Sequence, residues 1–113
     1  QVAKVVMVKT GDDLVMLVLP ATKQVNFRML ADILKTKSVR LAHEDEFGGL
    51  FPDCLLGAMP PFGNLYNIPV YVDTSLTEDP EIVFQAGTHT DTMKIRYADY
   101  ERLVAPKIAR FAL

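Results

Sequence analysis

Side chains that commonly perform metal or nucleophilic chemistry are sparse in this 113-residue chain, which has two histidines and one cysteine. His43 and His89 are not at metal-ligand spacing, and no cysteine or acidic pair accompanies either, so no metal site is predicted. His43 precedes three acidic residues, which indicates a surface position near a helix start. Cys54 precedes two leucines, which favours a small buried hydrophobe; a thiol hydrolase that uses Cys54 is the alternative.

His89 lies in a run of small and polar residues, 85–92, that includes Gly87 and Thr88. This run follows a short apolar stretch, 82–84, that reads as a buried strand. Polar loops at strand ends often carry functional residues, so His89 is a candidate, although an ordinary polar loop explains the pattern as well.

Lys4 interrupts an apolar run, 2–8, that reads as a strand. A lysine in such a run either extends its ammonium to water at a sheet edge or directs it into a cleft. The residues alone favour the sheet-edge interpretation.

A second candidate region is the loop from Gly57 to Gly63, which contains Ala58, Met59, Pro60 and Pro61. The two prolines lack amide donors and have restricted backbone angles, so the loop is stiff. The glycines allow another molecule to approach the main chain. The loop suits the floor of a small pocket; a rigid connection between two strands is the plainer alternative.

The elements that must position these residues follow from local patterns. Runs 2–8 and 14–19 flank a turn with Gly11 and predict a hairpin in a sheet covered on both faces. Asn26 is a predicted N-cap for a helix through about Lys35, with an apolar stripe facing the core. Further strands are predicted over 39–42, 68–72, 82–84 and 93–97, with a short acidic helical turn over 43–47.

At the C-terminal end, Asp99 is predicted to open a helix through Val104, with Tyr100, Leu103 and Val104 facing inward. Pro106 is predicted to restart this helix, with an apolar face formed by Ile108, Phe111 and Leu113. These elements predict one α+β domain over residues 1–113.

The composition limits the classes of function. A net charge of −2 argues against a broad nucleic-acid-binding surface, but not against recognition of one nucleotide at an RNA end. No apolar run is long enough to cross a bilayer, no signal peptide is recognised, and the single cysteine fits a reducing compartment. A cytoplasmic protein without a membrane partner is therefore expected. The chain starts at Gln1 within a strand-like run, which suggests that an N-terminal segment precedes it.

Several segments in order resemble the YbaK/prolyl-tRNA synthetase editing-domain family of aminoacyl-tRNA deacylases. They are 1–4, 17–20, Val25 with the helix to Leu34, 39–42, 57–63, 69–73, 83–89 and 97–111. The resemblance implies a mixed, mostly antiparallel sheet with surrounding helices, and a helical segment ahead of Gln1. It also implies hydrolysis of the ester of a mischarged tRNA, without metal or cofactor.

The resemblance assigns roles to individual residues. Lys4 matches the family's invariant lysine, which reverses the preference above, and Gly57 matches the glycine that opens the family's loop; both are expected to be catalytic. The expected substrate-binding residues are Ala58, Met59, Pro60, Pro61, Gly87, Thr88 and His89. Pro60 replaces the serine of the family's Cys-tRNA deacylases, which favours an alanine-type substrate.

These implications together predict a trans-editing deacylase that removes a small amino acid, such as alanine, from tRNA for proline or a similar tRNA. The expected partner is the aminoacylated 3′ end of the tRNA, with prolyl-tRNA synthetase as a second candidate. The alternative is a non-catalytic module of the same family that binds aminoacyl-tRNA or an amino acid.

Overall fold

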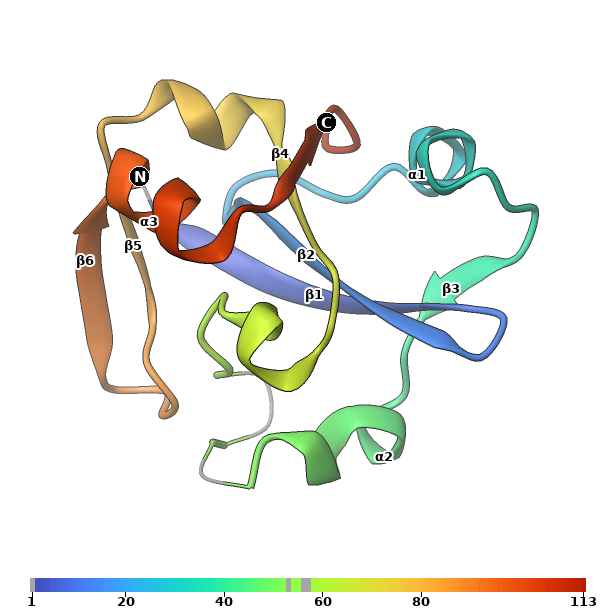
Figure 1. The fold of residues 1–113 in the computed structure, drawn as a ribbon, viewed down its shortest axis with the longest axis horizontal. Helices are drawn as coiled ribbons and strands as arrows, with labels where there is room; N and C mark the ends of the chain where they lie inside the picture. Colours follow the sequence, from blue (N-terminus) through green and yellow to red (C-terminus); the bar gives the residue numbers. More distant parts are fainter. Residues whose placement is uncertain (1, 53, 56–57) are drawn as a thin grey trace.

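The chain begins with the predicted β-hairpin. The computed structural model describes residues 2–52, 54–55 and 58–113, and Figure 1 shows their arrangement. Strands β1 (Ala3–Thr10) and β2 (Asp13–Pro20) pair antiparallel from Ala3 opposite Pro20 to Thr10 opposite Asp13. Gly11 has a positive φ of 61°, which the tight two-residue turn requires and which glycine adopts without steric cost.

The hairpin forms the middle of a mixed sheet with strand order β3-β1-β2-β4-β7. Strand β3 (Val39–Leu41) pairs antiparallel with β1, whereas β4 (Val70–Asp73) and β7 (Lys107–Ala109) add to β2 in parallel. Strands β5 (Glu81–Gln85) and β6 (Thr92–Arg96) form a separate antiparallel pair, which a parallel bridge between Val2 and Val83 connects to the start of β1. The predicted α+β class with a mixed sheet is confirmed.

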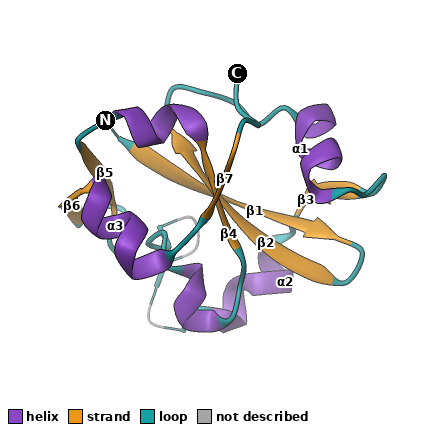
Figure 2. Ribbon diagram, turned by 45° about the horizontal axis from the view of Figure 1, so that its top comes forward, coloured by secondary structure: helices purple, strands orange, loops and turns teal. Residues whose placement is uncertain are grey.

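Both faces of the sheet are covered, as the apolar runs predicted. Met16 and Val18 of β2 face one buried cluster, which includes Phe84 and Tyr100, and the alternate residues Leu17 and Leu19 face a second cluster with Leu30 and Phe111. Figure 2 shows the crossing strands at the centre, with α1 and β3 at one end and the β5–β6 pair with α3 at the other. The β5–β6 pair therefore packs at the end of the hairpin where β1 begins.

Helix α1 (Phe27–Leu34) confirms the helix that was predicted from the Asn26 N-cap and the apolar stripe. The side chain of Asn26 accepts a hydrogen bond of 3.0 Å from Met29 N, which satisfies a free amide of the first turn. Lys35 ends the helix in a left-handed conformation. The apolar stripe packs on the second cluster with Phe27, Leu30, Ile33 and Leu34.

A short helix, α2 (Glu44–Phe47), is tied to the sheet by Glu46. The carboxylate of Glu46 lies 2.8 Å from both the Arg40 guanidinium and the Lys9 ammonium, and it accepts the His43 amide at 2.7 Å. The Arg40 guanidinium, followed by Lys9, holds the pKa of Glu46 well below its usual range. His43 lies exposed at the start of α2, as predicted, and the 3₁₀ helix η1 (Gly48–Leu50) follows directly.

The C-terminal prediction is wrong in part. Helix α3 (Tyr97–Val104) begins at Tyr97, before Asp99, and buries Tyr100 and Val104, but Leu103 is 58% exposed. Ala105 adopts a left-handed conformation that ends the helix, and the chain after Pro106 forms strand β7 where a helix was predicted. Phe111 is buried as expected, whereas Leu113 is exposed. Ile108 is also exposed, because parallel pairing of β7 with β4 determines which of its side chains face the core. Among the described residues, no helix has the length and apolar character needed to cross a membrane.

Asp73 fastens the C-terminal segment to β4. It caps the 3₁₀ helix η3 (Thr74–Glu78), where Oδ2 accepts from both the amide and the hydroxyl of Ser75. Its Oδ1 accepts the amides of Phe111 and Ala112, each at 2.9 Å. Burial raises the pKa of Asp73, but these hydrogen bonds together outweigh the burial and leave the pKa below its ordinary value.

We expect Asp73→Asn to lower the free energy of unfolding by about 2 kcal/mol at pH 7, because buried charge-assisted hydrogen bonds are lost. The depressed native pKa stabilises the fold above the unfolded value of about 4, and this stabilisation is lost as the pH falls through the native pKa. The difference between wild type and variant in urea unfolding should therefore shrink below about pH 4. Asp32→Asn, at an exposed position of α1, is the control, and equal stability of wild type and Asp73→Asn at pH 7 would contradict the prediction.

Candidate functional site

A cavity of about 320 Å³ lies where the start of β1 meets the β5–β6 pair. It brings together two of the predicted site residues, Lys4 of β1 and Met59 of the loop 57–63, which we call the proline loop. The cavity is lined by Val2, Ala3, Lys4, Val5, Ala21, Met59, Phe84, Gln85 and Thr92. We take this cavity as the candidate active site.

Lys4 is positioned by the hairpin. It lies opposite Leu19 in the β1–β2 register, and β3 pairs only with the far end of β1, from Val8 onward. The side chain is half-buried and lines the cavity. Lys4 therefore lines the cleft at a part of β1 that β3 does not cover.

The proline loop is joined to the β5–β6 turn through backbone hydrogen bonds. Gly87 N donates to Ala58 O at 2.9 Å, and Gly87 O accepts from Leu55 N at 2.7 Å. Gly87 is buried and has a positive φ of 96°, a conformation that side-chain-bearing residues rarely adopt. The structure thus brings Ala58 and Gly87 together, and their contact holds Met59 beside Phe84. Gly57 lies outside the described residues.

The loop offers few free amides. Ala58 N already donates to Leu55 O at 3.0 Å, and Pro60 and Pro61 have no amide hydrogen. Met59 N has no hydrogen-bond partner among the residues that the structure describes. Among the loop residues 58–61, Met59 is therefore the one whose amide could be offered to a ligand.

Pro60 and Pro61 do not line the cavity, and Pro61 holds the loop against the core. Pro61 is buried, and its carbonyl accepts a hydrogen bond of 2.7 Å from the Tyr100 hydroxyl, while Phe62 packs edge-on against the Tyr100 ring. Burial raises the pKa of Tyr100, so this hydroxyl stays protonated as a donor. Gly63, which was expected to admit another molecule, is buried; a Cβ there would lie 3.0 Å from Val70 Cγ2.

We expect Tyr100→Phe to lower the free energy of unfolding by roughly 1–3 kcal/mol, because the buried Pro61 carbonyl loses its donor. The measurement is urea unfolding. Tyr71→Phe, at a half-buried tyrosine on β4, is the matched control and should change stability less. Equal effects of the two variants would contradict the importance of this hydrogen bond.

Thr88 and His89 lie in the β5–β6 turn and outside the cavity lining. Thr88 Oγ1 donates to Asp91 Oδ2 at 2.6 Å and accepts Asp91 N at 2.9 Å, which closes the turn. The His89 side chain is exposed, and its carbonyl accepts a hydrogen bond from Gln85 Nε2 at 3.4 Å. The structure therefore does not bring Thr88 or His89 together with Lys4.

The polar residues that do line the cavity beside Lys4 are Gln85 and Thr92, which are paired across β5 and β6. Sequence reasoning missed both as site residues, although they are the two ends of the polar run. One ammonium, one amide and one hydroxyl beside the apolar side chains of Met59 and Phe84 suit a small ligand with an anionic or carbonyl group. Among the described residues, no cluster of three or more His, Cys, Asp or Glu could hold a metal ion.

The sequence matches a known family and a curated relative. The model of the aminoacyl-tRNA editing domain family matches residues 1–103. A curated relative, the multifunctional Ser/Thr-tRNA deacylase ProXp-y of Escherichia coli K12, is 31% identical over 98 residues. That match covers 86% of this chain and 58% of the relative, so the chain spans little more than half of the relative's length.

Solved structures share the fold. A proposed trans-editing enzyme for prolyl tRNA synthetase superposes with a TM-score of 0.88 at 17% identity, over 99% of this chain and 70% of that one. A proposed signal transduction protein from Marinobacter aquaeolei VT8 gives a TM-score of 0.86 at 16% identity, over 99% of this chain and 25% of that one. The predicted resemblance is confirmed by the family match, and this chain belongs to the aminoacyl-tRNA editing domain family.

Proposed function

We propose that this chain is a trans-editing aminoacyl-tRNA deacylase, which hydrolyses the ester between a small mischarged amino acid and the 3′-terminal adenosine of a tRNA. The observation that carries the proposal is the cavity at the start of β1, where Lys4 lies beside Met59 and Gln85. Membership of the editing family supports the reaction class. The cytoplasm, where charged tRNA is used, is the expected compartment.

In the proposed reaction, water attacks the ester carbonyl, the bond between the carbonyl carbon and the ribose oxygen breaks, and the ribose hydroxyl leaves with a proton. The products are the free amino acid and the uncharged tRNA. The neighbouring ribose hydroxyl of the tRNA assists the attacking water, and Lys4 holds the terminal nucleotide through its phosphate or ribose. Fixed backbone donors stabilise the oxyanion without reorganisation, a role we assign to Met59 N and to Gly57.

The size of the side chain is the expected basis of selectivity. Met59 and Phe84 are almost fully buried and wall the cavity, so exclusion of larger residues is steric. Alanine is the first candidate, as the family loop suggests, although Pro60, on which that preference rests, does not line the cavity. Serine and threonine are the second candidates, because Gln85 and Thr92 supply partners for a hydroxyl and the curated relative is a Ser/Thr-tRNA deacylase.

The test is a deacylation assay with alanine, serine, threonine and cysteine esterified to tRNA for proline, and with serine and threonine on other tRNAs. Hydrolysis of the alanyl ester would identify an alanine-specific deacylase, and hydrolysis of the seryl or threonyl ester a deacylase specific for hydroxyl amino acids. Binding of the charged tRNAs without turnover would support the non-catalytic module and refute the deacylase. Adding prolyl-tRNA synthetase to the same assay tests it as a partner, since a complex should raise the rate at low tRNA concentration.

A further inference from the structure

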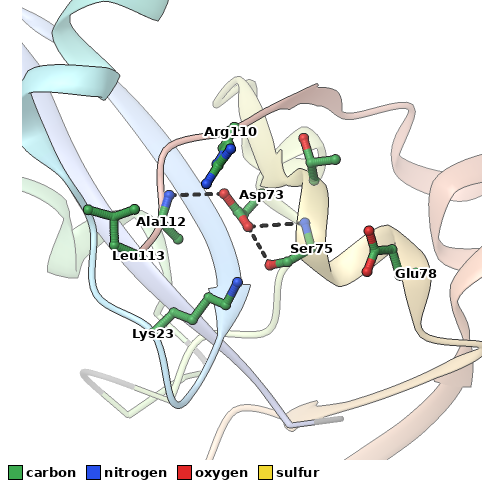
Figure 3. A pocket seen from close by; sticks show the side chains of 8 residues that line it. Lys23, Asp73, Ser75, Glu78, Arg110, Ala112 and Leu113 are labelled. Carbon is green, nitrogen blue, oxygen red and sulfur yellow. Dashed lines mark hydrogen bonds between the residues drawn. The ribbon is translucent and has the colours of Figure 1, made fainter.

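A second cavity, of about 340 Å³, has a different character from the candidate active site. It is formed by the turn after β2, by η3 and by the segment after β7. Figure 3 shows the Lys23 ammonium and the Arg110 guanidinium on opposite sides of Asp73 in this view, and both residues line the cavity. Its lining residues are Lys23, Asp73, Thr74, Ser75, Glu78, Arg110, Ala112 and Leu113.

The carboxylates in this cavity do not neutralise the two cations through ion pairs. Asp73 is 1% exposed, and its oxygens already accept hydrogen bonds from Ser75, Phe111 and Ala112. Glu78 is exposed and lies beyond Ser75 in Figure 3. Within the described part of the chain, neither Lys23 nor Arg110 forms an ion pair. The two cations are therefore available to an external anion.

The turn after β2 separates the two cavities. Ala21 lines the cavity that contains Lys4, and Lys23, two residues later, lines the second one. Backbone hydrogen bonds hold this turn: Ala21 N donates to Val2 O at 2.8 Å, and Lys23 N donates to Pro20 O at 3.0 Å. Two residues span at most ~7 Å of chain, so the backbone positions of Ala21 and Lys23 are close enough for one extended ligand to reach both cavities.

We infer that the cavity of Lys23 and Arg110 binds a backbone phosphate of the RNA whose 3′ end enters the Lys4 cavity. This inference rests on the proposed function. A guanidinium presents a planar fork to phosphate oxygens and an ammonium adds a point charge, so the pair suits a phosphate group. The threonine and serine side chains of η3 complete a polar wall. In a chain with a net charge of −2, such a local pair of cations gives the RNA a defined point of attachment.

The test measures binding of a hairpin RNA that carries no amino acid, across a range of salt concentrations. The hairpin contains the acceptor stem and the single-stranded 3′ end of tRNA for proline. The double variant Lys23→Gln/Arg110→Gln should bind about tenfold more weakly at 0.1 M salt. The slope of log affinity against log salt should fall in magnitude by about 0.7, which corresponds to one lost single-strand phosphate contact. Lys37→Gln, an exposed lysine outside both cavities, is the matched control and should leave the slope unchanged. Melting temperatures of all variants verify folding.

Two results would overturn the inference: an unchanged slope in the double variant, or wild-type protein that does not bind the hairpin RNA. Inorganic phosphate as competitor separates the sources of the phosphate. If it protects wild type but not the double variant against thermal unfolding, while the RNA does not bind, the cavity takes free phosphate and the RNA assignment is wrong. The assay needs no hydrolysis, so failure of the deacylase proposal is scored separately, by the absence of turnover in wild type.

Discussion

Lys4→Met is expected to lower kcat/KM for the mischarged tRNA by about 10²–10³-fold, the size of effect seen when one preorganised electrostatic contact is removed from an active site. Methionine keeps an unbranched apolar stem in the cavity but removes the ammonium. Because Lys4 is half-buried near the start of β1 and the strand register depends on backbone hydrogen bonds, the fold should survive. The measurement is single-turnover deacylation of the mischarged tRNA, together with thermal unfolding.

The control for this prediction is on the same strand. Lys9→Met also removes an ammonium from β1, but Lys9 pairs with Glu46 at the far end of the strand, away from the cavity. Lys9→Met should retain wild-type turnover with a small loss of stability, since partly exposed ion pairs contribute little. A Lys4→Met variant that is folded and as active as Lys9→Met would remove Lys4 from the mechanism.

Local signals account for the parts of the fold that the sequence predicted well. Gly11 marks a turn that needs a positive φ, and Asn26 supplies a side-chain acceptor for the first turn of α1. Both effects act within a few residues, so they can be read without knowledge of the rest of the chain.

Non-local pairing explains the failure at the C-terminal end. Residues 107–109 carry an apolar pattern that also fits a helix, and only the available edge of β4 makes them a strand. Leu103 and Ile108 were expected to face inward, yet each lies exposed, because Tyr100 and the parallel register of β7 set the buried face. Tertiary context overrides local preference in such short segments.

The candidate site was predictable only in part for a similar reason. Lys4 became a strong candidate through the family resemblance, since a lone lysine in an apolar run does not reveal which cavity it lines. Gln85 and Thr92 lie seven positions apart, and their pairing across β5 and β6 brings both to the cavity wall. His89, the more suggestive residue chemically, lies in the turn between them and is exposed.

Gly87→Ala is the second variant expected to have a large effect on activity. Gly87 has a φ of 96°, and alanine at this position would introduce backbone strain of about 1–3 kcal/mol. The strain can be relieved by moving the turn, which weakens the hydrogen bonds that Gly87 donates to Ala58 and accepts from Leu55. Those bonds hold Met59 in the cavity wall, and a displacement of about 1 Å in a reacting geometry can reduce turnover by about 10²-fold.

Gly11→Ala separates strain from function. Gly11 also has a positive φ, 61°, but a Cβ there meets no atom within 4 Å, and the hairpin turn lies at the other end of β1 from Lys4. Both variants should lose stability in urea unfolding, whereas only Gly87→Ala should lose turnover of mischarged tRNA beyond what its folded fraction explains. If Gly87→Ala retained full turnover despite its strain, the contact between the β5–β6 turn and the proline loop would be structural alone. The oxyanion role proposed for Met59 N would then lose its support, because that amide depends on the same contact for its position.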